Sequence, residues 1–110
     1  MERFVELGRL LDYYGAFLTE RQRSLARQVA DEDCSLSEVA EREGVSRQAV
    51  RDAVSRAAKE LSAYESTLRL IERTDRMRAL IAARLPLAES EGERAALTEL
   101  NNIWEDDDGV

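Results

Sequence analysis

The first part of the chain carries apolar residues three and four positions apart, which is the spacing of one face of an α-helix. This face comprises Phe4, Leu7, Leu11, Tyr14 and Leu18. Leu10 and Phe17 widen it. The pattern predicts a helix from about Glu2 to Leu18 with a face broad enough to be largely buried.

Two capping signals predict the starts of the next helices. Thr19 is followed three residues later by Gln22, and Ser35 is followed by Glu38. This spacing lets each side chain bond the backbone N–H group of the other residue, as in a capping box. We therefore expect a second helix that ends near Ala30 and a third that starts after Ser35.

The third helix, from about Leu36 to Arg42, is followed by the elements of a helix-turn-helix. Gly44 suits the left-handed conformation that commonly ends a helix. Ser46 caps the next helix, which leaves a turn of about three residues. The expected interior positions of the motif hold Ala40, Val45, Val50 and Ala53. One departure is Glu43, where an apolar residue is common, and we expect its stem to lie over the edge of the core.

The helix that starts after Ser46 is predicted to be long. Neither Gly nor Pro occurs before Pro86, so it is expected to run to about Ala83. Apolar residues alternate three and four apart along it and form a seam that needs a partner helix. That partner is either the first helix of the same chain or a second copy of the chain. The seam consists of Val54, Ala57, Leu61, Tyr64, Leu68 and Ile71.

Beyond Pro86 the sequence predicts a short helix followed by an acidic end. A short C-terminal helix is predicted from an apolar stripe that ends at Trp104 and includes Leu97, Leu100 and Ile103. The last residues, 105–110, are acidic. We therefore divide the chain into a helix-turn-helix domain at 1–85, a helical extension at 86–104 and an acidic tail at 105–110. With few aromatic residues and many good helix formers, the expected fold class is an all-α helix-turn-helix bundle.

The exposed face of the helix after the turn carries the candidate nucleic-acid-binding residues. Arginine and glutamine can each make two hydrogen bonds to a base edge, and lysine and arginine bind phosphates. The candidates are Arg47, Gln48, Arg51, Ser55, Arg56 and Lys59. The alternatives are a solvated face with an Arg56–Glu60 pair, or a helix-turn-helix kept only for protein binding.

Charge is distributed unevenly along the chain. The net charge is -7, but residues 79–110 hold two arginines against eight carboxylates. The segment 46–64 holds four cations against two carboxylates. A basic segment therefore lies within an acidic protein, and we expect the acidic tail to weaken nucleic-acid binding.

Several function classes lack their usual residues. The chain has no histidine, and Cys34 is its one cysteine. A metal site, a cofactor or an activated nucleophile is therefore not expected, and neither is an enzyme. Cys34 is interpreted as a small residue near a helix start rather than a redox sensor. No apolar stretch approaches the roughly 20 residues that cross a bilayer, so we expect a cytoplasmic protein.

Three segments together resemble the YlxM family of bacterial helix-turn-helix proteins. They are Leu10–Tyr14 with Leu18–Arg23, then Ser35–Ala40 with Val45–Val50, and finally Leu61–Leu68. The match covers about residues 4–85. The resemblance implies a fold similar to region four of sigma factors. It also implies a role in the signal recognition particle pathway, with the particle's RNA or its GTPase as partner, and a homodimer.

The leading hypothesis is a non-catalytic regulator that binds DNA or signal recognition particle RNA through the helix-turn-helix. The alternative is an adaptor that binds the particle's GTPase without direct nucleic-acid contact. Salt dependence separates the two, because phosphate contacts release counterions and weaken steeply with salt.

Overall fold

The computed structural model describes residues 2–103, and the side chains from residue 6 onward. Within these residues it contains α-helices and two short 3-10 helices and no strand, which confirms the all-α class. The described residues form two compact units that divide between Ile71 and Glu72, and the domain boundary at 85 stays a prediction. Trp104 and the acidic tail lie outside the described residues.

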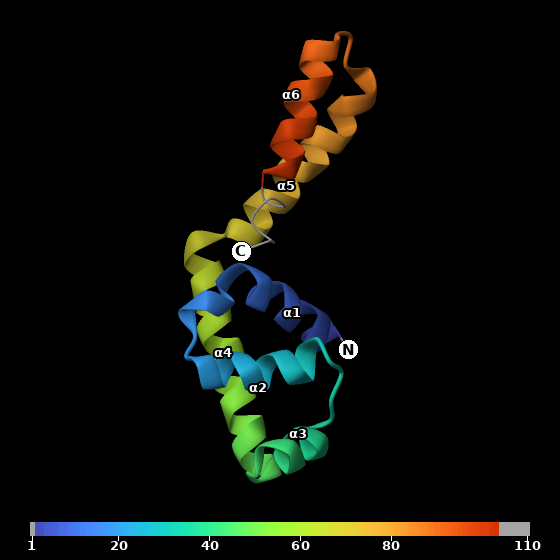
Figure 1. Ribbon diagram of the computed structural model, residues 1–110. Coiled ribbons are helices and arrows are strands. Elements are labelled where there is room, and N and C mark those ends of the chain that lie inside the picture. The colour runs from blue at the N-terminus through green and yellow to red at the C-terminus, as the bar shows by residue number, and fades with distance from the viewer. Residues whose placement is uncertain (1, 104–110) are drawn as a thin grey trace. The chain divides into compact units, whose positions relative to one another are not determined.

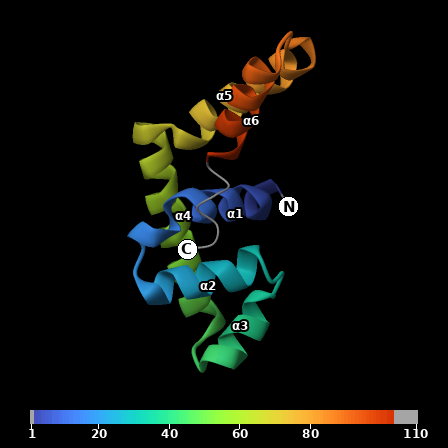
Figure 2. The same ribbon diagram turned by 45° about the horizontal axis from the view of Figure 1, so that its top comes forward.

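The first unit is a bundle built around one long helix. Its elements are α1 (Glu2–Tyr14), η1 (Gly15–Phe17), α2 (Glu20–Ala30), α3 (Leu36–Glu43) and α4 (Arg47–Leu68). Figures 1 and 2 show α1 and α2 lying across α4, with α3 beside the first turns of α4. The long helix α4 is thus the element that every other helix of the unit contacts.

Both predicted capping boxes are confirmed. The Thr19 hydroxyl accepts from the Gln22 backbone N–H at 3.1 Å, and the Gln22 side chain accepts from the Thr19 N–H at 3.0 Å. Ser35 and Glu38 make the equivalent bonds at 3.1 and 2.8 Å. These contacts satisfy backbone donors that have no partner inside the helix.

Much of the predicted seam packs inside the chain. Ala57 and Leu61 are fully buried against α1, in a core that also contains Leu7, Leu11 and Tyr14. Val54, Tyr64 and Ile71 pack against the edge of this core. Leu68 differs, because 42% of its surface is exposed at the end of α4. The first helix of the same chain therefore covers the centre of the seam.

The prediction of one continuous helix to about Ala83 is wrong. Helix α4 ends at Leu68, and α5 (Leu70–Arg84) begins two residues later. Arg69 between them adopts a left-handed conformation with φ 56°, which is unusual for a residue other than glycine. Ile71 consequently lies on α5 rather than on the helix that carries the rest of the seam.

Tyr14 of α1 provides the physical reason for this break. Its buried phenol donates to the Glu65 carboxylate at 2.5 Å and accepts from the Leu70 backbone N–H at 3.0 Å. The Ile71 N–H donates to the same Glu65 oxygen, also at 3.0 Å. Two backbone donors released by the break thus find side-chain acceptors, which a continuous helix would not need.

The first helix is also shorter than predicted. It ends at Tyr14 and is followed by the 3-10 helix η1, so the predicted end at Leu18 is wrong. Leu18 is still buried, but Phe17 is 62% exposed and meets only the edge of the core at Tyr64, with ring centroids 5.3 Å apart. The tighter winding of the 3-10 turn rotates Phe17 out of the α-helical register.

The second unit is a helical hairpin. The remainder of α5 leads through η2 (Leu85–Leu87), which contains Pro86, into α6 (Glu91–Asn102), and both views show α5 and α6 side by side. Ser90 caps α6 by accepting from the Glu93 N–H at 3.1 Å. Several large apolar side chains of this unit are at least 43% exposed: Leu80, Leu87, Leu100 and Ile103.

Candidate nucleic-acid interface

The turn between α3 and α4 has the predicted helix-turn-helix geometry. Gly44 ends α3 with φ 70°, and the Val45 N–H donates to the Ala40 carbonyl at 3.0 Å. The Ser46 hydroxyl then accepts from the Ala49 N–H at 3.0 Å and starts α4. A Cβ on Gly44 would meet no atom within 4 Å, so the glycine is required by its backbone conformation and not by crowding.

A second core holds the first turns of α4 in place. Its buried members come from α2, α3 and α4, and they are Leu25, Val29, Val39, Ala40 and Val50. Val45 and Ala53 pack against it, as the sequence predicted for the interior of the motif, and so does Cys34. The residues that follow Ser46 are therefore presented on a rigid support.

A partly buried polar network joins α2 to α3, and it was not predicted from the sequence. The Gln28 side chain, only 5% exposed, donates to Glu43 at 3.0 Å and accepts from Arg42 at 2.9 Å. Glu43 also pairs with Arg21 at 3.6 Å. These partners explain the carboxylate at a commonly apolar position. The available signal was Gln28 itself, which lies within the buried stripe of α2.

All six candidate binding residues are exposed on α4. At 100° per residue, Arg47, Arg51 and Ser55 fall within about 80° of one another. Two of them, Arg51 and Ser55, border a groove between α1 and α4 that Val29 of α2 and Leu36 of α3 also line. Gln48 and Lys59 lie farther round the helix, and Arg56 lies farthest, about 180° from Arg47. The candidates thus form a band around half of α4 rather than one stripe opposite the core.

The cations in this band are not neutralised by neighbouring carboxylates. Among the side chains that the structure describes, no ion pair links a carboxylate to any of Arg47, Arg51, Arg56 or Lys59. The Arg56–Glu60 pair of the alternative interpretation is not formed, and Glu60 instead accepts from the Tyr64 hydroxyl at 2.9 Å. Elsewhere in the unit, Arg27 and Arg42 pair with carboxylates at 2.6–3.1 Å. The helix after the turn therefore keeps its positive charge available.

Gln48 is the candidate whose side chain already has a partner. Its amide donates to Asp52 one turn along α4, at 2.9 Å. An adenine contact by Gln48 would have to replace or share this bond. Asp52 also places a negative charge within the cationic band, which leaves the arginines as the better-placed groups for phosphate.

The groove beside Arg51 and Ser55 lies between α1 and α4 and has a volume of about 670 Å³. Apolar side chains form its floor, and they are Leu7, Leu10, Val29, Leu36, Val54 and Ala58. Polar side chains border it, and they are Glu6, Arg51, Ser55 and Ser62. This groove could not be predicted from the sequence, because residues of α1, α2, α3 and α4 line it together.

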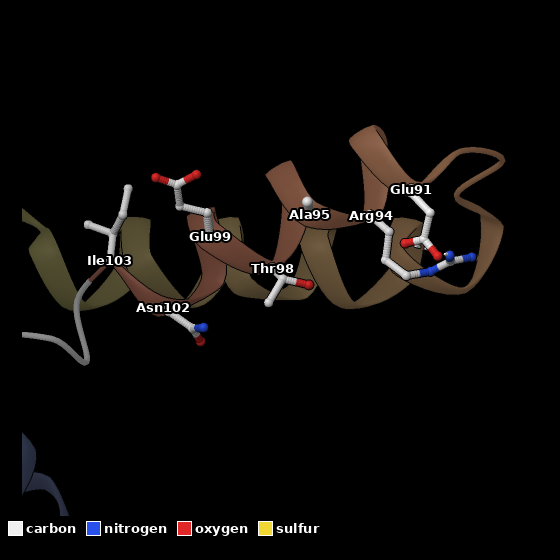
Figure 3. A pocket seen from close by; sticks show the side chains of 7 residues that line it. All are labelled: Glu91, Arg94, Ala95, Thr98, Glu99, Asn102 and Ile103. Atoms are coloured by element: carbon white, nitrogen blue, oxygen red, sulfur yellow. Dashed lines mark ion pairs between the residues drawn. The ribbon is translucent and has the colours of Figure 1, made fainter.

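A second hollow, on the hairpin unit, has no opposing wall. Figure 3 shows its lining side chains along one helix, among them Glu91 and Arg94, which pair at 3.7 Å. All of the residues that line it belong to α6 or immediately follow it. A site on a single helix surface cannot enclose a ligand as a cleft does.

Neither a metal cluster nor a membrane-spanning helix occurs in the part of the chain that the structure describes. No group of three or more metal-ligating side chains is found there. No helix there is both long enough and apolar enough to cross a bilayer.

Comparison with known proteins agrees with this architecture. The chain matches a family model over residues 1–100, that of UPF0122, described as "Putative helix-turn-helix protein, YlxM / p13 like". A UPF0122 protein of Clostridium botulinum is 45% identical over 76 residues, which cover 69% of this chain and 70% of that protein. One of Symbiobacterium thermophilum is 39% identical over 103 residues, covering 91% and 96%. The chain therefore belongs to the UPF0122 family of YlxM/p13-like helix-turn-helix proteins.

Proposed function

We propose that this protein is a non-catalytic nucleic-acid-binding regulator that contacts phosphates and bases through α4. The observation that carries the proposal is the set of four exposed cations on α4 that no carboxylate neutralises among the described side chains. Forming a phosphate contact with these groups does not first require breaking an ion pair. Such cations are the source of most nonspecific affinity for nucleic acid.

The spacing of the cations suits a polymer. Arg47 and Lys59 are separated by about 18 Å along the helix axis, at 1.5 Å per residue. This distance corresponds to about five nucleotides of one strand. The first two arginines lie one turn apart at the N-terminal end of α4, where a recognition helix contacts base edges. Arg47 and Arg51 therefore take the central role, contacting base edges and the phosphates beside them, and Arg56 and Lys59 add further phosphate contacts.

The resemblance to the YlxM family supports a place in the signal recognition particle pathway, with the particle's RNA or a DNA operator as the bound polymer. The net charge of -7 does not oppose this role. Most of the net negative charge lies in residues 79–110, which hold eight carboxylates and two arginines, whereas the segment 46–64 is positive. At physiological salt, charges separated by more than about 8 Å are largely screened, so the local charge of α4 dominates.

A second candidate is an adaptor that binds the particle's GTPase without touching nucleic acid. The observation that favours it is the exposure of large apolar side chains on the hairpin unit, where Leu80 and Leu87 are more than 60% exposed. Exposed apolar side chains of this size mark a protein interface when they form a contiguous patch. A homodimer would use the same kind of surface, and sedimentation equilibrium distinguishes it from a monomer.

The test is a fluorescence-anisotropy titration against signal recognition particle RNA and a mixed duplex DNA over a range of salt concentrations. With four phosphate contacts, the logarithm of the association constant should fall with a slope of about -3 against the logarithm of salt. The variant Arg47→Ala/Arg51→Ala should reduce the slope by about two. The matched control Arg73→Ala/Arg76→Ala removes the same charge from exposed positions of α5 and should leave the slope unchanged.

Either of two results would overturn the proposal. One is an absence of salt-sensitive binding to both polymers. The other is equal loss of affinity in the α4 variant and the α5 control, which would mean that only net charge matters. Complex formation with the particle's GTPase in the absence of nucleic-acid binding would favour the adaptor.

A further inference from the structure

We infer that the groove between α1 and α4 receives an unpaired nucleobase, so that the preferred ligand is a structured RNA with a bulged nucleotide beside a paired stem. This inference rests on the proposed function and specifies the ligand class of the same site. It depends on the composition of the groove, on its continuity with the cationic band, and on the distribution of charge around it.

The groove adjoins the residues that would hold the polymer backbone. Arg51 and Ser55 belong both to the band on α4 and to the rim of the groove. From Arg51 to Ser62 the groove follows α4 for about 16 Å. A strand whose phosphates contact Arg47 and Arg51 would therefore have a neighbouring nucleotide within reach of the groove.

The floor suits the faces of a base. Leu7 and Leu10 of α1 are buried with their outer surfaces at the groove, and Val54 and Ala58 of α4 pack against the same core beside them. Enzymes that extrude a base commonly hold it between aromatic or apolar side chains. The volume of about 670 Å³ is also within the range of about 300–1,000 Å³ typical of small-molecule sites.

The rim suits the edge of a base better than a phosphate. Glu6 places a carboxylate at the groove, which repels a phosphate but accepts hydrogen bonds from a base amino group. The hydroxyls of Ser55 and Ser62 can donate or accept. Arg51 lies at the same rim, where its guanidinium can bind the phosphate that follows the base. The groove thus suits the base of a nucleotide, and Arg51 at its rim suits the phosphate.

A fully paired duplex cannot use this groove. Its bases are stacked within the helix, and only their edges are accessible to a protein. RNA recognition commonly depends on loops and bulges, where unstacked bases are free to enter a protein surface. The groove would therefore favour RNA with an unpaired nucleotide over a continuous duplex.

The experiment compares two RNA hairpins that differ by a single unpaired adenosine in the stem, titrated with the full chain at constant salt. The bulged hairpin should bind about tenfold more tightly, which corresponds to about 1.4 kcal/mol. Ala58→Phe fills the floor of the groove and should remove this preference while leaving the affinity for the paired hairpin unchanged. Ser62→Leu narrows the rim from an exposed position and should act in the same direction without disturbing the core.

Ser66→Leu is the matched control, since Ser66 is exposed one turn farther along α4 and outside the groove. It should leave the preference for the bulged hairpin intact. Equal affinity for the two hairpins would overturn the inference while leaving the proposed function standing. A preference that survives both Ala58→Phe and Ser62→Leu would also overturn it, because the base would then bind elsewhere. Absence of salt-sensitive binding to any polymer would overturn the inference together with the proposed function.

Discussion

Replacing Tyr14 by phenylalanine should lower the free energy of unfolding of the first unit by more than the loss of one hydrogen bond, because its hydroxyl makes two. The phenol is fully buried and serves two partners, donating to Glu65 at 2.5 Å and accepting from the Leu70 N–H at 3.0 Å. Burial, and then the hydrogen bond to Glu65, raise the pKa of Tyr14, so the phenol stays protonated and able to donate at neutral pH. The substitution keeps the ring and removes only these two contacts.

The loss in the free energy of unfolding can be estimated from the two groups that lose a hydrogen bond, the Glu65 carboxylate and the Leu70 N–H. A hydrogen bond to a charged group contributes about 1.5–3 kcal/mol, and a backbone N–H left without an acceptor costs about 1–3 kcal/mol. Relaxation of Arg69 from its left-handed conformation into a continuous helix would recover about 1–2 kcal/mol. We therefore expect a loss of about 2–4 kcal/mol in the free energy of unfolding. For a unit of this size, that loss lowers the melting temperature by roughly 10–25 °C.

The assay is urea and thermal unfolding followed by circular dichroism. Tyr13→Phe is the matched control, because it removes a hydroxyl from the neighbouring, partly exposed tyrosine, which packs at the edge of the same core. The control should change stability by less than about 0.5 kcal/mol. If Tyr14→Phe behaves like Tyr13→Phe, the break between α4 and α5 does not depend on the phenol, and our explanation of it is wrong.

Three further predictions concern the turn, a cap and the tail. Gly44→Ala should cost about 1–2 kcal/mol in urea unfolding, because alanine must adopt the left-handed conformation although its methyl group meets no atom, and an unchanged midpoint would contradict this. Hydrogen bonds from Ser35 lower the pKa of Glu38, so the ionised carboxylate stabilises the fold above pH about 4.3 and this contribution is lost as the pH falls through the lowered value. Glu38→Gln should therefore melt below the wild type at pH 7, and the difference should shrink on acidification, whereas a difference independent of pH would refute the assignment. Deleting residues 105–110 should raise affinity for RNA at low salt by removing competing carboxylates, and unchanged affinity would exclude this role for the tail.

Local chemistry made the helix-turn-helix predictable. The capping boxes, Gly44 and the cap at Ser46 each depend on residues within a few positions of one another, so the sequence contains all the partners. The candidate cations could be placed on α4 for the same reason, because they follow the cap at Ser46, although they spread around half of the helix and do not share one face. The absence of ion pairs to these described cations could not be predicted. Glu60 lies one turn from Arg56 and could have paired with it, but it accepts from Tyr64 instead.

The sequence alone therefore determined the fold class, the capped helix starts and the turn, which are governed by short-range contacts. Tertiary structure decided where the long helix ends, because the stretch around Arg69 has no breaker of its own and the Leu70 N–H finds its acceptor on Tyr14, 56 residues away. It also decided that Arg51 and Ser55 border a groove, since that groove is lined by residues of four helices that only the fold brings together. Contacts between distant segments have no fixed sequence spacing, so periodicity and capping patterns cannot reveal them.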